Sequence, residues 1–151
     1  MNIIHKTFGS GFFTGYIPIA SGTFGSIVAL IPFIITGFAK PVILIPAIIL
    51  FALYGIYLGN IFEKEYGHDP AECTIDEVVG MWISLLFLPR NFLVITITFL
   101  LWRIIDIVKP FPLKQAEKLP GGLGIMMDDI LGGIYTCIIM NFIVIRFFPL
   151  K

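Results

Sequence analysis

Residues 42–62 read VILIPAIILFALYGIYLGNIF, an apolar run without one charged side chain. An α-helix of about 20 such residues reaches across the hydrocarbon core of a bilayer. Another apolar segment, Thr23–Phe38, precedes this run, and Lys40-Pro41 separates the two. We therefore expect the two segments to form a helical hairpin inside a membrane.

The composition of the 151-residue chain supports this expectation. Hydrophobic residues make up 58% of the chain and charged residues 13%, whereas soluble domains average roughly 45–50% and about 25%. A bilayer accepts an apolar outer surface as long as backbone groups are paired internally. The ten basic and ten acidic residues give a net charge of zero, which provides no basic field for a nucleic-acid partner.

Three later apolar segments complete the predicted bundle. Val78–Leu88 is too short to span alone, Phe92–Val108 is long enough if its polar end lies at the interface, and Ile130–Phe148 is the last spanning run. The chain is thus predicted to be one all-α domain over residues 1–151, a polytopic integral membrane helical bundle with about four to five membrane-embedded helices. The polar stretches Glu63–Glu77 and Lys109–Asp129 are predicted to be irregular, because prolines and glycines interrupt them.

The basic residues predict how the bundle is oriented. Six lie near the N-terminus or in or beside the two polar stretches, and four lie at the opposite helix ends. The positive-inside rule then places the N-terminus and both polar stretches in the cytoplasm. We expect a multi-pass protein of the inner-membrane type with its polar site facing the cytoplasm.

Five carboxylates near this face are the strongest functional signal, namely Asp76, Glu77, Asp106, Asp128 and Asp129. Such groups repel one another in a low dielectric unless some are protonated or a cation neutralises them. Hard oxygen ligands without a Cys/His set favour Mg²⁺ over zinc. The alternative is that these acids only cap helices or lie in first turns, where the helix dipole favours negative charge.

Basic side chains accompany the acids. Arg103, Asp106 and Lys109 are spaced by three residues, which places them near one stripe of a helix. Either Asp106 pairs with its two neighbours while Lys109 extends to the interface, or Asp106 is a metal ligand or base while Arg103 and Lys109 bind phosphate oxygens. The two cysteines, Cys73 and Cys137, lack the spacing of a metal or redox site and are predicted to be free thiols.

Two glycine-containing segments border the predicted helices. Ser21-Gly22-Thr23-Phe24-Gly25-Ser26 lies at the start of the first predicted spanning helix, so its free N–H groups can bind an anion such as phosphate. It can equally be a cap followed by close-packing positions. Gly121–Gly124 leads into Asp128-Asp129, and no Gly-Lys-Ser/Thr follows as it would in a nucleotide phosphate loop.

Four motifs occur in an order that resembles the phosphatidylglycerophosphatase A family. They are Ser-Gly-Thr-Phe-Gly-Ser (21–26), Asp-Glu-Val-Val-Gly-Met-Trp (76–82), Arg-Ile-Ile-Asp-Ile-Val-Lys-Pro-Phe-Pro (103–112) and Gly-Gly-Leu-Gly-Ile-Met-Met-Asp-Asp-Ile-Leu-Gly-Gly (121–133). The resemblance covers about residues 8–148. The hairpin tips and the stretch 63–73 lie outside its motifs.

The resemblance implies a Mg²⁺-dependent phosphatase of phospholipid biosynthesis. Its substrate would be the membrane lipid phosphatidylglycerophosphate, whose terminal phosphomonoester is hydrolysed to phosphatidylglycerol and inorganic phosphate. Carried over by motif position, the metal ligands are Asp76, Glu77, Asp128 and Asp129, and the catalytic residues are Asp76, Glu77, Asp106 and Asp129. The substrate phosphate would be bound by Ser21, Gly22, Thr23, Ser26, Arg103 and Lys109.

Other functions agree with parts of the pattern. A small carrier or channel would also use intramembrane Asp, Arg and Lys, but its charges would be distributed through the membrane depth. A phosphatase for another lipid phosphate would use the same site, whereas a phosphoalcohol transferase is disfavoured because its Asp-Gly/Ala-Arg spacing is absent. The pairs Gly55/Gly59 and Gly132-Gly133 permit close helix packing within one chain or in an oligomer.

Overall fold

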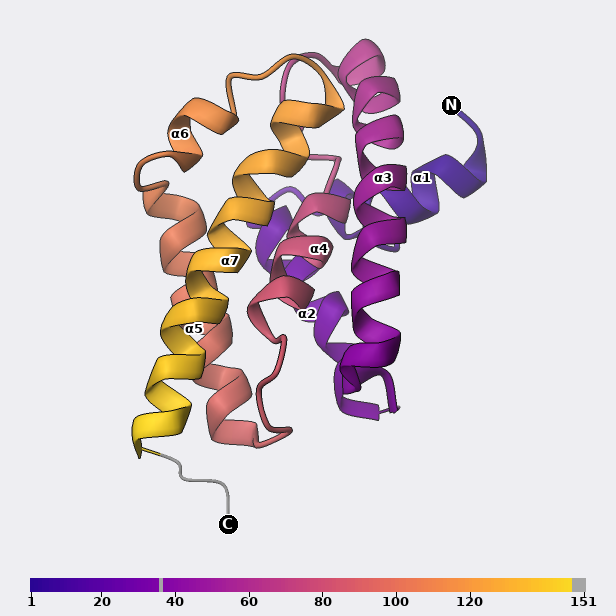
Figure 1. The fold of residues 1–151 in the computed structure, drawn as a ribbon. Helices are drawn as coiled ribbons and strands as arrows, with labels where there is room; N and C mark the ends of the chain where they lie inside the picture. The colour runs from indigo at the N-terminus through magenta and orange to yellow at the C-terminus, as the bar shows by residue number, and fades with distance from the viewer. Residues whose placement is uncertain (36, 148–151) are drawn as a thin grey trace.

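The computed structural model describes residues 1–35 and 37–147, and within these ranges the fold is entirely helical (Figure 1). The all-α class predicted from the sequence is confirmed. The seven α-helices and two 3₁₀ turns of the described residues are α1 (Ile3–Gly9), η1 (Thr14–Tyr16), α2 (Ser21–Ile35), η2 (Gly37–Ala39), α3 (Pro41–Tyr66), α4 (Ile75–Ser84), α5 (Phe92–Val108), α6 (Leu113–Ala116) and α7 (Gly122–Phe147).

Two of these helices, α3 and α7, are long and apolar enough to cross a membrane. Each contains 26 residues, which is more than the about 20 that a span requires. In the described part of the chain, α2 and α5 are shorter, with 15 and 17 residues, so the four to five membrane-embedded helices remain a prediction. Phe148, the end of the last predicted run, lies outside the described residues.

Both pairs of acids, Asp76-Glu77 and Asp128-Asp129, lie in helices, although the stretches that contain them were predicted to be irregular. Helix α3 continues to Tyr66 and α4 begins at Ile75, so Asp76 and Glu77 lie in the first turn of a helix, where the helix dipole favours negative charge. Helix α7 begins at Gly122, eight residues before the predicted run. Close packing of Gly122 on the Ile56 carbonyl of α3 compensates for the low helix propensity of glycine.

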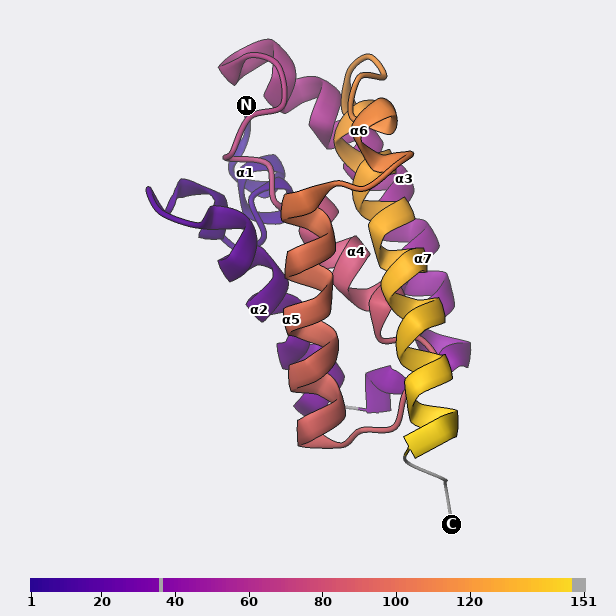
Figure 2. The same cartoon turned by 90° about the vertical axis from the view of Figure 1, so that its left-hand side faces the viewer.

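Helix α4 lies at the centre of the bundle and packs on α2, α3, α5 and α7 (Figures 1 and 2). Nine of its ten residues are buried. A Cβ added to Gly133 of α7 would lie 2.6 Å from the carbonyl oxygen of Gly80 in α4. Gly59 of α3 and Gly122 of α7 are in similarly close contact. The glycine pairs therefore serve packing within this chain.

The polar segments gather at one end of the bundle, which is the upper end in both views (Figures 1 and 2). This end contains the C-terminal end of α3, the beginning of α4, the end of α5, α6 and the beginning of α7. The N-terminal amine also lies here, 3.2 Å from Glu65 Oε2. One shared face for the three polar segments agrees with the sequence prediction, and its cytoplasmic location stays a prediction.

Replacing Gly133 should disrupt the contact between α4 and α7. We expect Gly133→Leu to lower the free energy of unfolding by about 1–3 kcal/mol, because overpacking forces the helices apart. Thermal melting in detergent measures this loss of stability. Gly37→Leu is the matched control, since a Cβ at Gly37 meets no atom within 4 Å. Equal melting temperatures for the two variants would show that the close approach is not required.

Candidate active site

Side chains from five parts of the chain line one polar pocket of about 300 Å³ at this end of the bundle. They come from the start of α2, the loop between α3 and α4, the first turn of α4, the end of α5 and its following residue, and the second turn of α7. Six acids and one base are among the lining residues, namely Asp69, Asp76, Glu77, Asp106, Asp128, Asp129 and Lys109. The fold therefore brings together most of the predicted site residues.

Asp76, Glu77 and Asp129 form the acidic centre of the pocket. One carboxylate oxygen of each lies within 4.8 Å of the corresponding oxygens of the other two. Asp76 and Asp129 are only 7% and 5% exposed. Burial, followed by the neighbouring charge of Glu77, raises the pKa of Asp76 well above its ordinary value, and burial also raises the pKa of Glu77. These groups fit the predicted acidic metal-binding cluster.

Unpaired polar atoms concentrate in the same place. Among the described residues, five buried side-chain nitrogen or oxygen atoms have no hydrogen-bond partner: Asp76 Oδ1, Glu77 Oε2, Arg103 Nε, Asp128 Oδ1 and Asp129 Oδ2. Buried polar atoms normally have partners, so a cluster without them indicates a ligand site. The four carboxylate oxygens suit a hard cation such as Mg²⁺, and the guanidinium nitrogen suits an anion.

Asp128 stands apart from the other predicted metal ligands. Its Oδ2 accepts a hydrogen bond from Lys109 Nζ at 2.7 Å, and Glu117 Oε1 lies 3.4 Å from the same nitrogen. Burial opposes the charge on Lys109, but these two carboxylates outweigh it and raise the pKa of the lysine. Lys109 thus places a positive charge in the pocket, and Asp128 and Glu117 hold its ammonium group in position.

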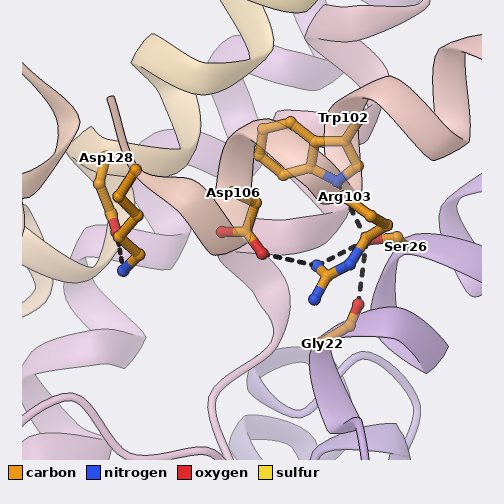
Figure 3. A network of polar contacts seen from close by, with 7 residues as sticks. Gly22, Ser26, Trp102, Arg103, Asp106 and Asp128 are labelled. Atoms are coloured by element: carbon orange, nitrogen blue, oxygen red, sulfur yellow. Dashed lines mark hydrogen bonds and ion pairs between the residues drawn. The ribbon is translucent and has the colours of Figure 1, made fainter. Parts of the chain in front are cut away.

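Arg103 and Asp106 form the other charged pair of the site (Figure 3). Arg103 Nη1 lies 2.9 Å from Asp106 Oδ2, one helical turn away on α5, and both side chains are largely buried. This agrees with the intrahelical pairing weighed from the sequence for Arg103, while Lys109 pairs with α7 instead. Asp106 nevertheless lines the pocket.

The Ser21–Ser26 segment forms the first turns of α2, which agrees with its predicted place at the start of a helix. Ser21 lines the pocket, and Gly22 leaves room for Glu77 Oε1 and Arg103 Nη2, which a Cβ would contact. Thr23 is not among the lining residues, and Ser26 is completely buried. The start of α2 therefore reaches the pocket through Ser21, while Gly22 packs beside Glu77 and Arg103.

Asp69 lines the pocket but was not predicted to belong to the site. In the sequence it belongs to an Asp-Pro pair that indicates only a turn, and it has a positive φ of 47°. Burial raises its pKa. The signal that was available is the excess of acids in the stretch 63–77. Cys73, another lining residue, and Cys137 are both free, as predicted.

This fold and site define an α-helical membrane-associated protein whose polar end presents a carboxylate cluster beside two cationic side chains. The family model of phosphatidylglycerophosphatase A matches residues 7–144. The chain belongs to this family and is a lipid phosphatase, which confirms the resemblance noted in the sequence. The carrier or channel alternative has no support from the family.

Curated relatives cover most of the chain. Phosphatidylglycerophosphatase A of Escherichia coli K12 is 37% identical over 137 residues, with 88% of this chain and 79% of the relative aligned. The Haemophilus influenzae protein of the same name is also 37% identical, with 86% and 82% aligned. A Bacteroides thetaiotaomicron protein, provisionally named a phosphatidylinositol-3-phosphatase, is 39% identical with 87% and 88% aligned. No solved structure matches this chain significantly.

Asp129→Asn tests the carboxylate cluster without requiring turnover. The amide removes one negative charge from the three clustered acids, so the variant should melt no lower than the parent protein in EDTA. It should also lose the stabilisation by Mg²⁺, which for a bound cation is about 2.7 kcal/mol at about 100 times its dissociation constant. Melting curves with EDTA and with Mg²⁺ measure both effects.

Glu65→Gln is the control for this substitution, because Glu65 pairs with the N-terminal amine outside the cluster. It should keep the full Mg²⁺ effect. An Asp129→Asn variant that is stabilised by Mg²⁺ as strongly as the parent protein would remove Asp129 from the cation site.

Proposed function

We propose that this protein is a Mg²⁺-dependent phosphatidylglycerophosphatase of the bacterial inner membrane, with its pocket facing the cytoplasm. It would hydrolyse the terminal phosphomonoester of phosphatidylglycerophosphate and release inorganic phosphate. The observation that carries the proposal is the group of unpartnered carboxylate oxygens in the pocket that Lys109 also lines. Arg103 is not a lining residue, but its Nη2 and Glu77 Oε1 both lie close to Gly22. Two relatives at 37% identity with this name support the choice of substrate.

Asp76, Glu77 and Asp129 would hold the metal ion, because their oxygens converge and lack other partners. Bound there, Mg²⁺ would neutralise phosphoryl oxygens and favour ionisation of a water molecule. Asp128 would offer the metal only one oxygen, since its Oδ2 accepts a hydrogen bond from Lys109. Its second oxygen, Oδ1, has no partner and remains available to the metal.

Two side chains and one helix end would contact the phosphate of the substrate. Arg103 supplies a buried Nε without a partner, and Lys109 supplies a charge that its two carboxylates hold in place. Ser21 at the N-terminal end of α2 adds a hydroxyl and a helix dipole of favourable sign. These groups stabilise the charge that spreads over the phosphoryl oxygens in the transition state.

The reaction needs a water molecule and a proton acceptor. The water oxygen forms the new bond to phosphorus while the phosphorus–oxygen ester bond on the opposite side breaks. Asp106 lines the pocket and would accept the proton of the water, while the leaving alkoxide is protonated from solvent. The ion pair with Arg103 fixes the position of the Asp106 carboxylate.

A second substrate has a specific observation in its favour. The Bacteroides relative is 39% identical, and its name refers to a phosphoinositide. Both lipids carry a phosphomonoester on a headgroup, so the same metal and phosphate contacts would serve either one. The alcohol that leaves is glycerol-based in one case and an inositol ring in the other.

Phosphate release from each lipid separates these substrates. We expect purified protein in detergent micelles to release phosphate from phosphatidylglycerophosphate, with kcat/KM at least about tenfold above that for phosphatidylinositol-3-phosphate, which is about 1.4 kcal/mol of selectivity. EDTA should stop the reaction and added Mg²⁺ should restore it. The reverse preference would transfer the proposal to the phosphoinositide. No release from either lipid by folded protein would reject both.

The affinity for Mg²⁺ should increase with pH. The raised pKa of Asp76 and Glu77 in the metal-free protein means that protons compete with the cation at higher pH than for ordinary carboxylates. Mg²⁺ binding should therefore release protons, and it should weaken as the pH falls, starting at a higher pH than for a site of ordinary carboxylates. Calorimetry in buffers of different ionisation enthalpy counts these protons. A pH-independent affinity without proton release would contradict the assignment of these ligands.

A further inference from the structure

Ser26 has no hydrogen-bonding capacity left for a substrate. Its side chain is completely buried. Its hydroxyl donates to the Gly22 carbonyl at 2.9 Å and accepts from Trp102 Nε1 at 3.1 Å and, in a longer contact, from Arg103 Nη1 at 3.5 Å (Figure 3). A serine hydroxyl has one donor and two acceptor positions, and all three are occupied here. Ser26 must therefore act through its neighbours.

Within residues 1–35 and 37–147, the hydrogen bonds and ion pair of Arg103 all involve Nη1. Nη1 donates to Asp106 on one side and to Ser26 on the other, and Figure 3 shows the guanidinium between these two side chains. Nε is buried without a partner, and Nη2 lies beside Gly22, where Glu77 Oε1 also comes close. The edge formed by Nε and Nη2 is the one that binds two oxygens of a phosphate group side by side.

Trp102 fixes the direction of the serine hydroxyl. Its indole is completely buried and packs on Gly80 of α4 and Gly132 of α7, where a Cβ would collide with the ring. Its N–H occupies one lone pair of Ser26, while the Ser26 hydrogen is directed to the Gly22 carbonyl. The remaining lone pair points to Arg103, so the orientation of the hydroxyl is set by the helix packing.

We propose that Ser26, oriented by Trp102, is a positioning residue that holds Arg103 with its Nε–Nη2 edge presented to the phosphate of the substrate. The inference rests on the proposed function, because it assigns Arg103 to a phosphate group. It differs from the sequence prediction, in which Ser26 itself contacts phosphate. Loss of Ser26 should leave the guanidinium bound to Asp106 but free to rotate about that contact.

The chain contains a matched control for each residue. Ser84 is also completely buried, and its hydroxyl donates to the Gly80 carbonyl at 2.8 Å, one helical turn earlier, as Ser26 does to Gly22. Trp82 is buried as well, and its Nε1 donates to the Ala29 carbonyl at 2.9 Å. Neither control contacts Arg103, so Ser84→Ala and Trp82→Phe report the packing cost alone.

The test is a double-mutant cycle with the lipid that the parent protein hydrolyses. We expect Ser26→Ala to reduce kcat/KM about tenfold, or about 1.4 kcal/mol, at a melting temperature equal to that of Ser84→Ala. Trp102→Phe should change kcat/KM in the same direction and Trp82→Phe should not. In an Arg103→Ala background, Ser26→Ala should have no further effect, because a residue that acts through Arg103 cannot act without it. Additive losses would make Ser26 a structural residue and overturn the proposal.

Binding of inorganic phosphate separates this proposal from the proposed function. In the presence of Mg²⁺, Ser26→Ala should bind phosphate about tenfold more weakly than the parent protein and Ser84→Ala should bind it equally well. If Ser26→Ala binds phosphate more weakly and Ser84→Ala does not, the positioning role is supported even if neither lipid is hydrolysed. Equal binding by all three proteins, or no binding by the parent protein, overturns it.

Discussion

The close approach of α4 and α7 determines where the site can form. Gly80 and Gly133 let the two helix backbones meet, and a Cβ on Gly80 would lie 3.0 Å from the carbonyl of Asp129. Asp76 and Glu77, one turn before Gly80, are thereby placed beside Asp129, one turn before Gly133. Because buried helices are packed without free volume, the small residues and the acidic cluster are parts of one arrangement.

The pairing of the basic residues explains why the acidic cluster is left for a cation. At an effective dielectric constant of about 20, two negative charges 4.8 Å apart repel by about 3 kcal/mol. Arg103 and Lys109 form ion pairs with Asp106 and Asp128 rather than with the cluster. The site thus has a negative group, Asp76, Glu77 and Asp129, and two basic residues paired with other acids. The proposed binding of a metal ion and a phosphate ester rests on this separation.

The sequence predicted the chemistry of the site better than its geometry. Charge, hydropathy and motif order were sufficient for the helical class, the family and the gathering of acids at one end. The separation of Asp128 from the other acids depends on Lys109 reaching across to α7, and the burial of Ser26 depends on Trp102. Such contacts join residues far apart in the chain, and no local pattern specifies them. Asp69 was missed for the same reason.

Asp69 also bears on the choice between the two lipid substrates. The residues proposed to contact the cation and the phosphate come from the four motifs, whereas Asp69 belongs to the stretch 63–73 outside them and still lines the pocket. Both candidate lipids share the phosphate group and differ in the alcohol attached to it. A residue that borders the pocket without belonging to the phosphate contacts is placed to meet that alcohol. We therefore expect headgroup selectivity to depend on the loop between α3 and α4 rather than on the metal cluster.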